Sequence, residues 1–288
     1  MNDNATSAPG SDIVLSEQAA AGVAHALLPG LGNHDIRVES GTEHLVVVAP
    51  GYGVVRVAKS AGSATLMGRR TALLRALSLL DLPFAVPQPL SEVATVDGFT
   101  AVATSWVPGK PHEKGKGAPA ALREVLEALR WVGTQPIAGL LAEPHGYAGG
   151  PDWARLMGDA IDQLPADVRD DARSRLDAAL ALPPVLPSFV HADLAGDNMR
   201  WSEDGRLVGV IDWDWAAAWD PAIDAACLAW HGWEAVQAAV DEDTFLRART
   251  WQRTFGIEQI VAGWLRPPGM ADALERTAAW LRRTRDQS

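Results

Sequence analysis

The stretch that decides the fold is FVHADLAGDNMRW, Phe189–Trp201, followed after a short turn by GVIDWDW, Gly209–Trp215. Apolar residues lead into the polar positions of both segments, a pattern typical of strands that carry polar groups at their ends. Two strands joined by a turn bring such ends to one edge. We therefore expect Asp193, Asn198 and Asp212 to meet at one rim of a hairpin.

This set of residue types suits phosphoryl transfer. One carboxylate can orient an attacking hydroxyl and accept its proton, while an amide oxygen and a second carboxylate can hold Mg²⁺ against nucleotide phosphates. Each residue alone is more often part of an ordinary surface turn. Together, on two apolar strands that follow a separate β-rich segment, they favour a kinase.

The same segments resemble the aminoglycoside phosphotransferase family, which are small-molecule kinases with a protein-kinase-like fold. The family's H-G-D-x-x-x-x-N matches HADLAGDN, with Ala192 where glycine is usual, and its I-D-W/F matches IDWD. Its G-D-P-x-x-D-L-A matches WDPAIDAA, Trp219–Ala226. The resemblance runs from about Ile36 onwards. PFAVPQPLSE and the order of the C-terminal motifs are most similar to viomycin and capreomycin phosphotransferases, and macrolide phosphotransferases come next.

The resemblance implies a role for each matching residue. Asp193 is expected to be the catalytic carboxylate, and Asn198 and Asp212 the Mg²⁺ ligands. His191 is expected to support the catalytic loop and not to carry a proton. Asp224 resembles the family's carboxylate that accepts hydrogen bonds from the loop backbone, with helix capping as its alternative.

Asp214 and Asp220 are expected on the substrate side, where they either bind a cationic substrate or are ordinary exposed charges. Six tryptophans surround this region and could offer faces to a cation, although tryptophan at such spacing is more often core. They are Trp201, Trp213, Trp215, Trp219, Trp230 and Trp233.

The nucleotide is expected at the N-terminal part of the chain. In such folds, backbone groups of the linker between the lobes hold adenine, which points to the Ser105 carbonyl and the Val107 amide. Ser40 and Gly41 lie in the turn SGTEH, which could cover the phosphates, although one glycine in a hairpin is weak evidence.

A cation should reach the phosphates from the third strand, and Arg56 and Lys59 both qualify. They lie three residues apart and so point to opposite faces of a regular strand. The family's wording slightly favours Arg56 and leaves the choice open. The family also pairs this cation with a helix glutamate, but no acidic residue occurs between Glu43 and Asp81. We expect that pair to be missing or rebuilt from elsewhere.

The predicted fold class is α+β, with a small β-rich N-terminal lobe and a larger, mainly helical C-terminal lobe. The expected parts are a flexible tail over 1–12, a nucleotide-binding lobe over 13–104, a hinge over 105–109 and a catalytic, substrate-binding lobe over 110–288. Within the last part, apolar spacing predicts one β hairpin and several helices. Two of these helices are expected to be continuous, over 223–240 and 244–264.

Composition excludes several classes of protein. The 288 residues carry a net charge of −11, with −3 in residues 1–107 and −8 in residues 108–288, so no basic footprint for nucleic acid is present. The single cysteine, Cys227, excludes an internal disulfide. No apolar stretch approaches the length of a membrane span, and the first residues lack the order of a signal peptide. We expect a cytoplasmic protein with no membrane partner.

The sequence therefore predicts a phosphotransferase that uses ATP, or GTP, with Mg²⁺ and acts on a hydroxyl of a small molecule. The acidic C-terminal part suggests a cationic substrate, such as a peptide or aminoglycoside antibiotic. Two alternatives remain open: a housekeeping metabolite kinase of the same fold, and a pseudokinase that binds ligands without turnover. Oligomeric state is not predicted.

Overall fold

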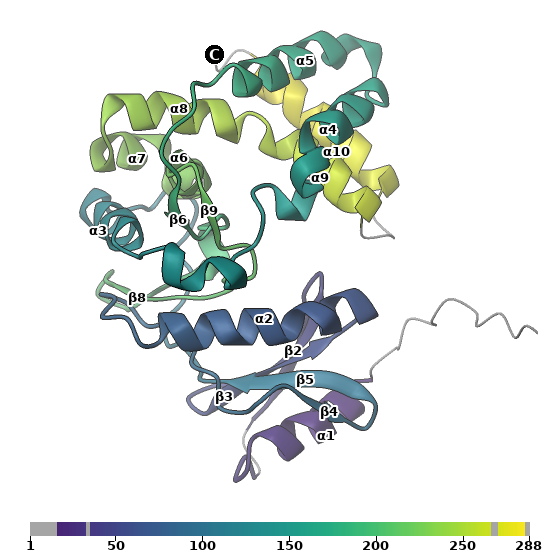
Figure 1. Cartoon of the computed structure of the whole chain (residues 1–288), viewed down its shortest axis with the longest axis vertical. Helices are drawn as coiled ribbons and strands as arrows, with labels where there is room; N and C mark the ends of the chain where they lie inside the picture. The colour runs from purple at the N-terminus through teal and green to yellow at the C-terminus, as the bar shows by residue number, and fades with distance from the viewer. Residues whose placement is uncertain (1–15, 33–34, 266–269, 286–288) are drawn as a thin grey trace, which may run out of the picture. The chain divides into compact units, whose positions relative to one another are not determined.

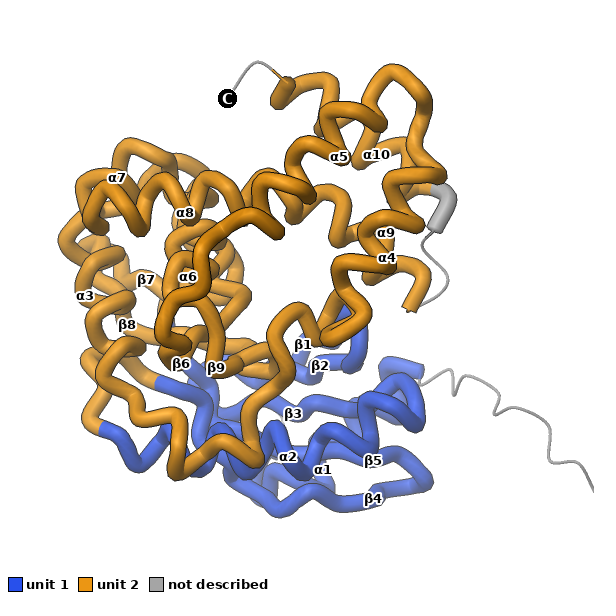
Figure 2. Tube along the Cα trace, turned by 45° about the horizontal axis from the view of Figure 1, so that its top comes forward, with its two compact units in different colours: residues 1–80, 86–108 blue, residues 81–85, 109–288 orange. Residues whose placement is uncertain are grey.

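The computed structural model describes residues 16–32, 35–265 and 270–285. The chain divides into two compact units, one made of 1–80 with 86–108 and the other of 81–85 with 109–288 (Figure 2). One division falls between Pro108 and Gly109, inside the expected hinge 105–109. The expected tail, residues 1–12, lies outside the described residues.

The first unit is built on a five-stranded antiparallel sheet in the order β1-β2-β3-β5-β4. The valine-rich runs form β2 and β3, two of the three central strands, because β-branched side chains fit a pleated, half-buried surface. The strands are β1 (Arg37–Ser40), β2 (His44–Ala49), β3 (Gly53–Ala58), β4 (Ala94–Val96) and β5 (Phe99–Thr104).

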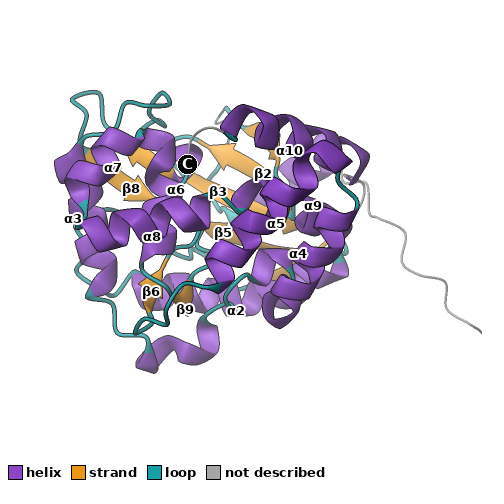
Figure 3. Cartoon of the chain, turned by 90° about the horizontal axis from the view of Figure 1, so that it is seen from above, coloured by secondary structure: helices purple, strands orange, loops and turns teal. Residues whose placement is uncertain are grey.

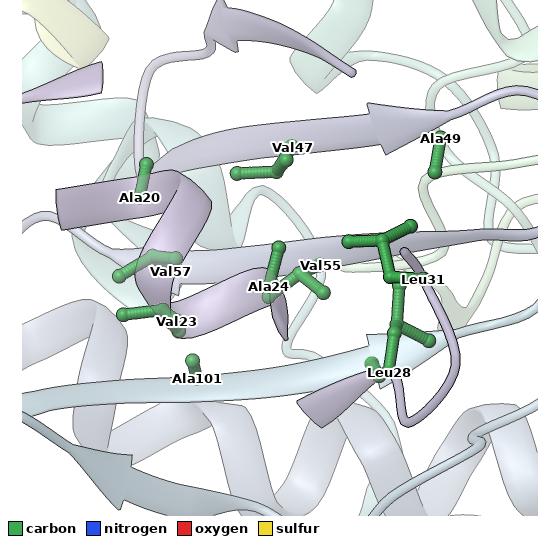
Figure 4. Close-up of a cluster of buried hydrophobic side chains, with 11 residues drawn as sticks. Ala20, Val23, Ala24, Leu28, Leu31, Val47, Ala49, Val55, Val57 and Ala101 are labelled. Atoms are coloured by element: carbon green, nitrogen blue, oxygen red, sulfur yellow. The ribbon is translucent and has the colours of Figure 1, made fainter. Parts of the chain in front are cut away.

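Two helices, α1 (Glu17–Leu27) and α2 (Ala61–Leu77), cover opposite faces of this sheet (Figure 1). On the α1 side, eleven buried apolar residues form one cluster (Figure 4). Val55 and Val57 belong to that cluster, so the intervening Arg56 of β3 points to the opposite face, where α2 packs. The residues of the cluster are Ala20, Val23, Ala24, Leu28, Leu31, Val47, Ala49, Val55, Val57, Ala101 and Ala103.

The second unit is mainly helical (Figure 3). Its α-helices are α3 (Pro119–Arg130), α4 (Trp153–Asp162), α5 (Ala166–Leu180), α6 (Ala222–Cys227), α7 (Trp233–Ala239), α8 (Glu242–Gln252), α9 (Phe255–Leu265) and α10 (Met270–Thr284). None of the helices within the described ranges has the length and apolar character needed to cross a membrane.

The two helices expected to be continuous over 223–240 and 244–264 are each interrupted, so that prediction is wrong. The first breaks at Gly232, whose φ of 102° no helix accommodates, between a 3-10 helix (Leu228–His231) and α7. The second breaks between α8 and α9, where the Thr254 hydroxyl donates to the Trp251 carbonyl over 2.8 Å. Apolar spacing continues across both breaks and therefore did not reveal them.

The single hairpin expected in this part is instead two separate antiparallel pairs. The strand β6 (Ser188–Val190) pairs with β9 (Ala217–Trp219), and β7 (Met199–Trp201) pairs with β8 (Leu207–Val210). The β7–β8 pair also contacts Ala85, because the Ala85 amide donates to Val208 and the Val210 amide donates to Ala85, each over 2.9 Å. These two bonds explain why residues 81–85 belong to the second unit.

The cluster beneath α1 allows a test of the fold. Leu31 is 1% exposed within it, so Leu31→Ala should lower the free energy of unfolding by about 2–5 kcal/mol, since a cavity remains where the side chain was. Leu79, which is 83% exposed, is the matched control, and Leu79→Ala should change it by less than about 0.5 kcal/mol. Urea denaturation measures both. Equal effects would contradict this placement of the core.

Candidate active site

Asn198 is held by Asp193 through its amide nitrogen. Asn198 Nδ2 donates to the main-chain oxygen of Asp193 over 2.8 Å and to Asp193 Oδ2 over 2.9 Å. Two acceptors on one side determine which end of the amide is nitrogen. The amide oxygen of Asn198 therefore points away from Asp193, as a ligand atom would.

Asp212 is tied to the same place through the backbone. Asn198 directly precedes β7, Asp212 follows shortly after β8, and the Ile211 amide donates to the Asn198 carbonyl over 2.9 Å. Asp212 itself is exposed and has a left-handed φ of 62°. The structure thus brings Asp193, Asn198 and Asp212 together at the open end of the β7–β8 pair.

His191 is a supporting residue. Its Nδ1 accepts from the Asp193 amide over 3.2 Å, and its Nε2 lies 3.0 Å from the Ile211 carbonyl. This pattern requires a neutral ring with the proton on Nε2. Burial agrees, because it lowers the pKa of His191 to about 4. With both nitrogens engaged by backbone, the imidazole links the catalytic loop to the end of β8.

Asp224, in the first turn of α6, accepts the loop backbone with both carboxylate oxygens. The His191 amide donates to Oδ2 over 2.9 Å and the Ala192 amide donates to Oδ1 over 2.8 Å. Ala192 has a φ of 63°, a left-handed conformation that glycine adopts more readily than alanine. The contact expected of Asp224 is therefore present. Burial raises the pKa of this carboxyl to about 7.

The charge on Asp193 is costly where it lies. Burial first, and then the nearby carboxylates of Asp212, Asp224 and Asp214, raise the pKa of Asp193 to about 7, against a lowering by the Asn198 hydrogen bond. A base works best when its pKa lies near the working pH. The surroundings therefore suit Asp193 to accept a proton at neutral pH.

The donor set also suits Mg²⁺. This ion prefers a few hard oxygen ligands from the protein and completes its shell with water and phosphate oxygens. An oriented amide oxygen on Asn198 and an exposed carboxylate on Asp212 supply such ligands. A divalent ion there would also offset the repulsion that Asp193 experiences.

Asp220 is buried and paired within its own unit, so the alternative of an ordinary exposed charge is wrong for it. It is 5% exposed and accepts from Arg247 Nε and Trp251 Nε1, both over 2.6 Å, and from the Ala222 amide over 3.0 Å. A cationic substrate would have to displace Arg247. Asp214 is also buried, at 6% exposed, and its charge acts on Asp193 and His191.

The linker segment in the first unit presents two backbone groups. Ser105 is fixed by Gln88, because its amide donates to the Gln88 carbonyl over 2.7 Å and its hydroxyl accepts from the Gln88 amide over 2.8 Å. Within the described ranges, neither the Ser105 carbonyl nor the Val107 amide forms a hydrogen bond.

The two candidate cations, Arg56 in β3 and Lys59 just after it, have different surroundings. Lys59 Nζ donates to Ser40 Oγ over 2.6 Å and to the Gly41 carbonyl over 2.5 Å, so it is tied to the turn between β1 and β2. Arg56 Nη2 lies 3.0 Å from His44 Nδ1, on the sheet face that α2 covers. The two cations thus contact different parts of the Ser40–His44 segment.

Sequence reasoning missed a close contact inside the catalytic loop. A Cβ atom at Gly196 would lie 2.0 Å from the indole nitrogen of Trp230, so only glycine fits between Asp193 and Asn198 at this point. The signal, a glycine in the matched motif, was visible, but its partner 34 positions later was not. Of the other tryptophans, Trp201 and Trp213 are buried in the core.

A buried carboxylate, Glu258 of α9, was also missed. It is 1% exposed and accepts from Tyr147, from Trp153 Nε1 over 2.8 Å and from the Thr254 hydroxyl over 3.2 Å. Burial, then Glu258, and to a smaller extent Asp193, raise the pKa of Tyr147. No motif marked Glu258, because its donors come from three separate segments.

The chain matches proteins of known kind over most of its length. Residues 35–259 match the model of the phosphotransferase enzyme family. The chain is 32% identical to viomycin phosphotransferase of Streptomyces vinaceus over 257 residues, covering 81% of this chain and 88% of that protein.

Solved structures are similar as well. One is the GDP and kanamycin complex of APH(2″)-IIIa, with a TM-score of 0.77, 18% identity, and 93% of this chain and 99% of that chain covered. Another is the streptomycin–ATP–APH(2″)-IIa ternary complex, with a TM-score of 0.68, 18% identity, and 94% and 97% covered. These likenesses confirm the predicted α+β fold.

The raised pKa of Asp193 predicts that Asp193→Asn stabilises the protein more as the pH rises. The folded pKa of about 7 exceeds the ordinary 3.8, so the wild type loses stability as the pH rises through that interval, whereas asparagine has no charge to bury. Without metal or nucleotide, the Tm of the variant relative to the wild type should rise from about pH 5.5 to about pH 8.5. Asp197→Asn, at an exposed residue of the same loop, is the control. A constant difference would contradict this account.

The Gly196–Trp230 contact predicts that Gly196→Ala destabilises the protein by about 1–3 kcal/mol, because the added methyl group has no room. Trp230→Phe removes the indole nitrogen and should recover part of the loss in the double variant. The control is Gly158→Ala in α4, where the added atom meets only ordinary contacts and should be neutral or stabilising. Chemical denaturation of the four variants measures this. Additive losses from Gly196→Ala and Trp230→Phe would argue against the contact.

Proposed function

The chain belongs to the phosphotransferase enzyme family, and on that premise we propose that it transfers the γ-phosphate of a nucleoside triphosphate to a hydroxyl of a small cationic molecule. The observation that carries this proposal is the Asp193–Asn198–Asp212 arrangement at the end of the β7–β8 pair. It combines a base, an oriented amide oxygen and an exposed carboxylate, which is the set that phosphoryl transfer requires.

Asp193 is the proposed general base. A hydroxyl placed against its carboxylate would donate a hydrogen bond and lose its proton to Asp193 as the oxygen attacks the γ-phosphorus, while the bond from that phosphorus to the β–γ bridging oxygen breaks and the nucleoside diphosphate leaves. Asn198 keeps the Asp193 carboxylate in one orientation, and the His191 ring and the Asp224 carboxylate keep the backbone of the loop in place. These are positioning roles, since none of the three residues needs to exchange a proton.

Asn198 and Asp212 are the proposed holders of Mg²⁺. When bound, the ion neutralises phosphate charge and helps to orient the transferred group. The field at this place is favourable to a cation, because the same neighbouring carboxylates that raise the pKa of Asp193 would attract it.

On the nucleotide side, the Ser105 carbonyl and the Val107 amide are proposed to pair with adenine. Arg56 is favoured over Lys59 as the cation for the phosphates, because Arg56 lies within β3 on the sheet face that α2 covers, whereas Lys59 follows the end of the strand. One of the similar solved structures carries GDP and another carries ATP. We propose ATP as the donor and keep GTP as an outcome of the assay.

The proposed acceptor is a cationic antibiotic of the peptide or aminoglycoside kind. The relative at 32% identity is named for viomycin, and kanamycin and streptomycin are bound in two of the similar structures. These compounds support an antibiotic acceptor. Asp214 is proposed to favour a cationic acceptor through its field, since it is nearly buried.

The test is incubation of purified protein with Mg-ATP or Mg-GTP and a library of cationic antibiotics, amino sugars and amino alcohols. Mass spectrometry then detects the gain of one phosphate. Phosphorylation of an antibiotic supports the proposal, and phosphorylation of a metabolite alone would replace it with a housekeeping kinase. Binding of Mg-nucleotide without any product across the library would indicate a pseudokinase.

Asp193→Asn should reduce kcat for the phosphorylated compound by about 10²–10⁴-fold, because it removes the base. Mg-nucleotide should still raise its Tm, since Asp193 is not a proposed ligand of metal or phosphate. Asp197→Asn, at the exposed neighbour, should keep the wild-type rate. Unchanged turnover in Asp193→Asn would show that another group accepts the proton.

A further inference from the structure

An ion pair in the first unit joins α2 to the turn that precedes β2. Arg70 Nη1 of α2 lies 2.5 Å from Glu43 Oε2, and the two side chains are only 4% and 18% exposed. The helix supplies the cation and the strand end supplies the acid. The expected pair had a cation on the strand and an acid on the helix, and here the two charges are exchanged. A pair of this kind needs no acidic residue within α2.

The same turn collects two further cations. Lys59 bonds to Ser40 and Gly41 at its start, and Arg56 bonds to His44 at its end. Three cations, from β3, from the position after it and from α2, therefore contact four of the five residues Ser40–His44, of which one, Glu43, is acidic. Such an excess of positive charge around a short turn suits a polyphosphate.

We propose that Glu43 and Arg70 form a positioning pair that holds the Ser40–His44 turn and α2 in the geometry that binds the nucleotide phosphates. The inference rests on the proposed function. The helix α2 starts at Ala61 with Ser60 as its N-cap, so only Lys59 and this cap separate it from the end of β3. A shift of α2 would therefore move Lys59 and the end of β3, which carries Arg56. The pair thus sets the spacing between the turn and the cations, and Glu43 engages Arg70 while Arg56 bonds to His44.

Stability alone does not account for this pair. The helix α2 already buries Met67, Leu73, Leu74 and Leu77. Replacement of a buried ion pair by apolar residues is often neutral or stabilising, because both charges lose their hydration. A second ion pair of the same helix, Arg75 with Glu92, is exposed at 49% and 83% and involves no residue of the turn. It provides a matched control.

The experiment compares Arg70→Gln, Glu43→Gln and the exchange Glu43→Arg/Arg70→Glu with Arg75→Gln. Isothermal titration of the full chain with Mg-ATP and Mg-GTP gives the nucleotide Kd, and the kinetics give KM for nucleotide and acceptor separately. Each single variant should weaken nucleotide binding by about tenfold, the size of coupling expected for residues in contact. The acceptor KM should stay within about twofold, and the exchange should recover affinity relative to either single variant.

Unchanged nucleotide affinity in folded Arg70→Gln, or an equal rise in both KM values, would overturn the inference. If Arg70→Gln does not fold, Arg70→Lys and Glu43→Asp test the inference instead, since they keep both charges and change the geometry of the ion pair. Weaker nucleotide binding at a near wild-type Tm supports the positioning role, and unchanged binding refutes it. Failure of the wild type to bind Mg-nucleotide would instead refute the proposed function, which keeps the two failures distinct.

Discussion

The catalytic loop depends on one carboxylate that accepts two consecutive backbone amides. Asp224 receives the amides of His191 and Ala192, and the second of these residues has a left-handed backbone. A buried amide without an acceptor costs free energy, so a loop of this shape requires an acceptor directly beneath it. The β6–β9 pair supplies it, because β9 runs antiparallel to β6 and leads through Pro221 into α6. The loop and its acceptor are thus positioned by the same two strands.

The site is kept at a cost in stability. Ala192 and Asp212 have left-handed φ values that ordinary residues avoid, and burial with neighbouring carboxylates raises the pKa of Asp193. Each term favours another conformation or a protonated side chain. Such strain persists only where several surrounding contacts together hold the residues in the strained conformation. Three contacts hold the catalytic loop here: those of the His191 ring, of the Asp224 carboxylate, and of Gly196 with Trp230.

Local patterns predicted much of the fold and of the site. The valine-rich strands, the Asp193–Asn198–Asp212 set and the Asp224 contact all follow from residues within short matched segments. The remainder depends on partners far apart in the sequence. The pairing of β6 with β9 gives no periodic signal, and Arg247 cancels the charge of Asp220 from 27 positions away. Glu43 precedes Arg70 by 27 positions, so a search for an acid within the helix could not find the pair.

The net negative charge of the C-terminal part is therefore weak evidence for a cationic substrate. Several of its carboxylates are neutralised by cations of the same unit: Asp167 pairs with Arg282, Asp171 with Arg175, and Asp220 with Arg247. Surface charges also act over only about 8–10 Å at physiological salt. The field that a cationic ligand meets is set by the carboxylates near Asp193, whose repulsion is visible in its raised pKa. Net charge alone consequently carries little of the case for a cationic acceptor, and the local cluster around the catalytic loop carries most of it.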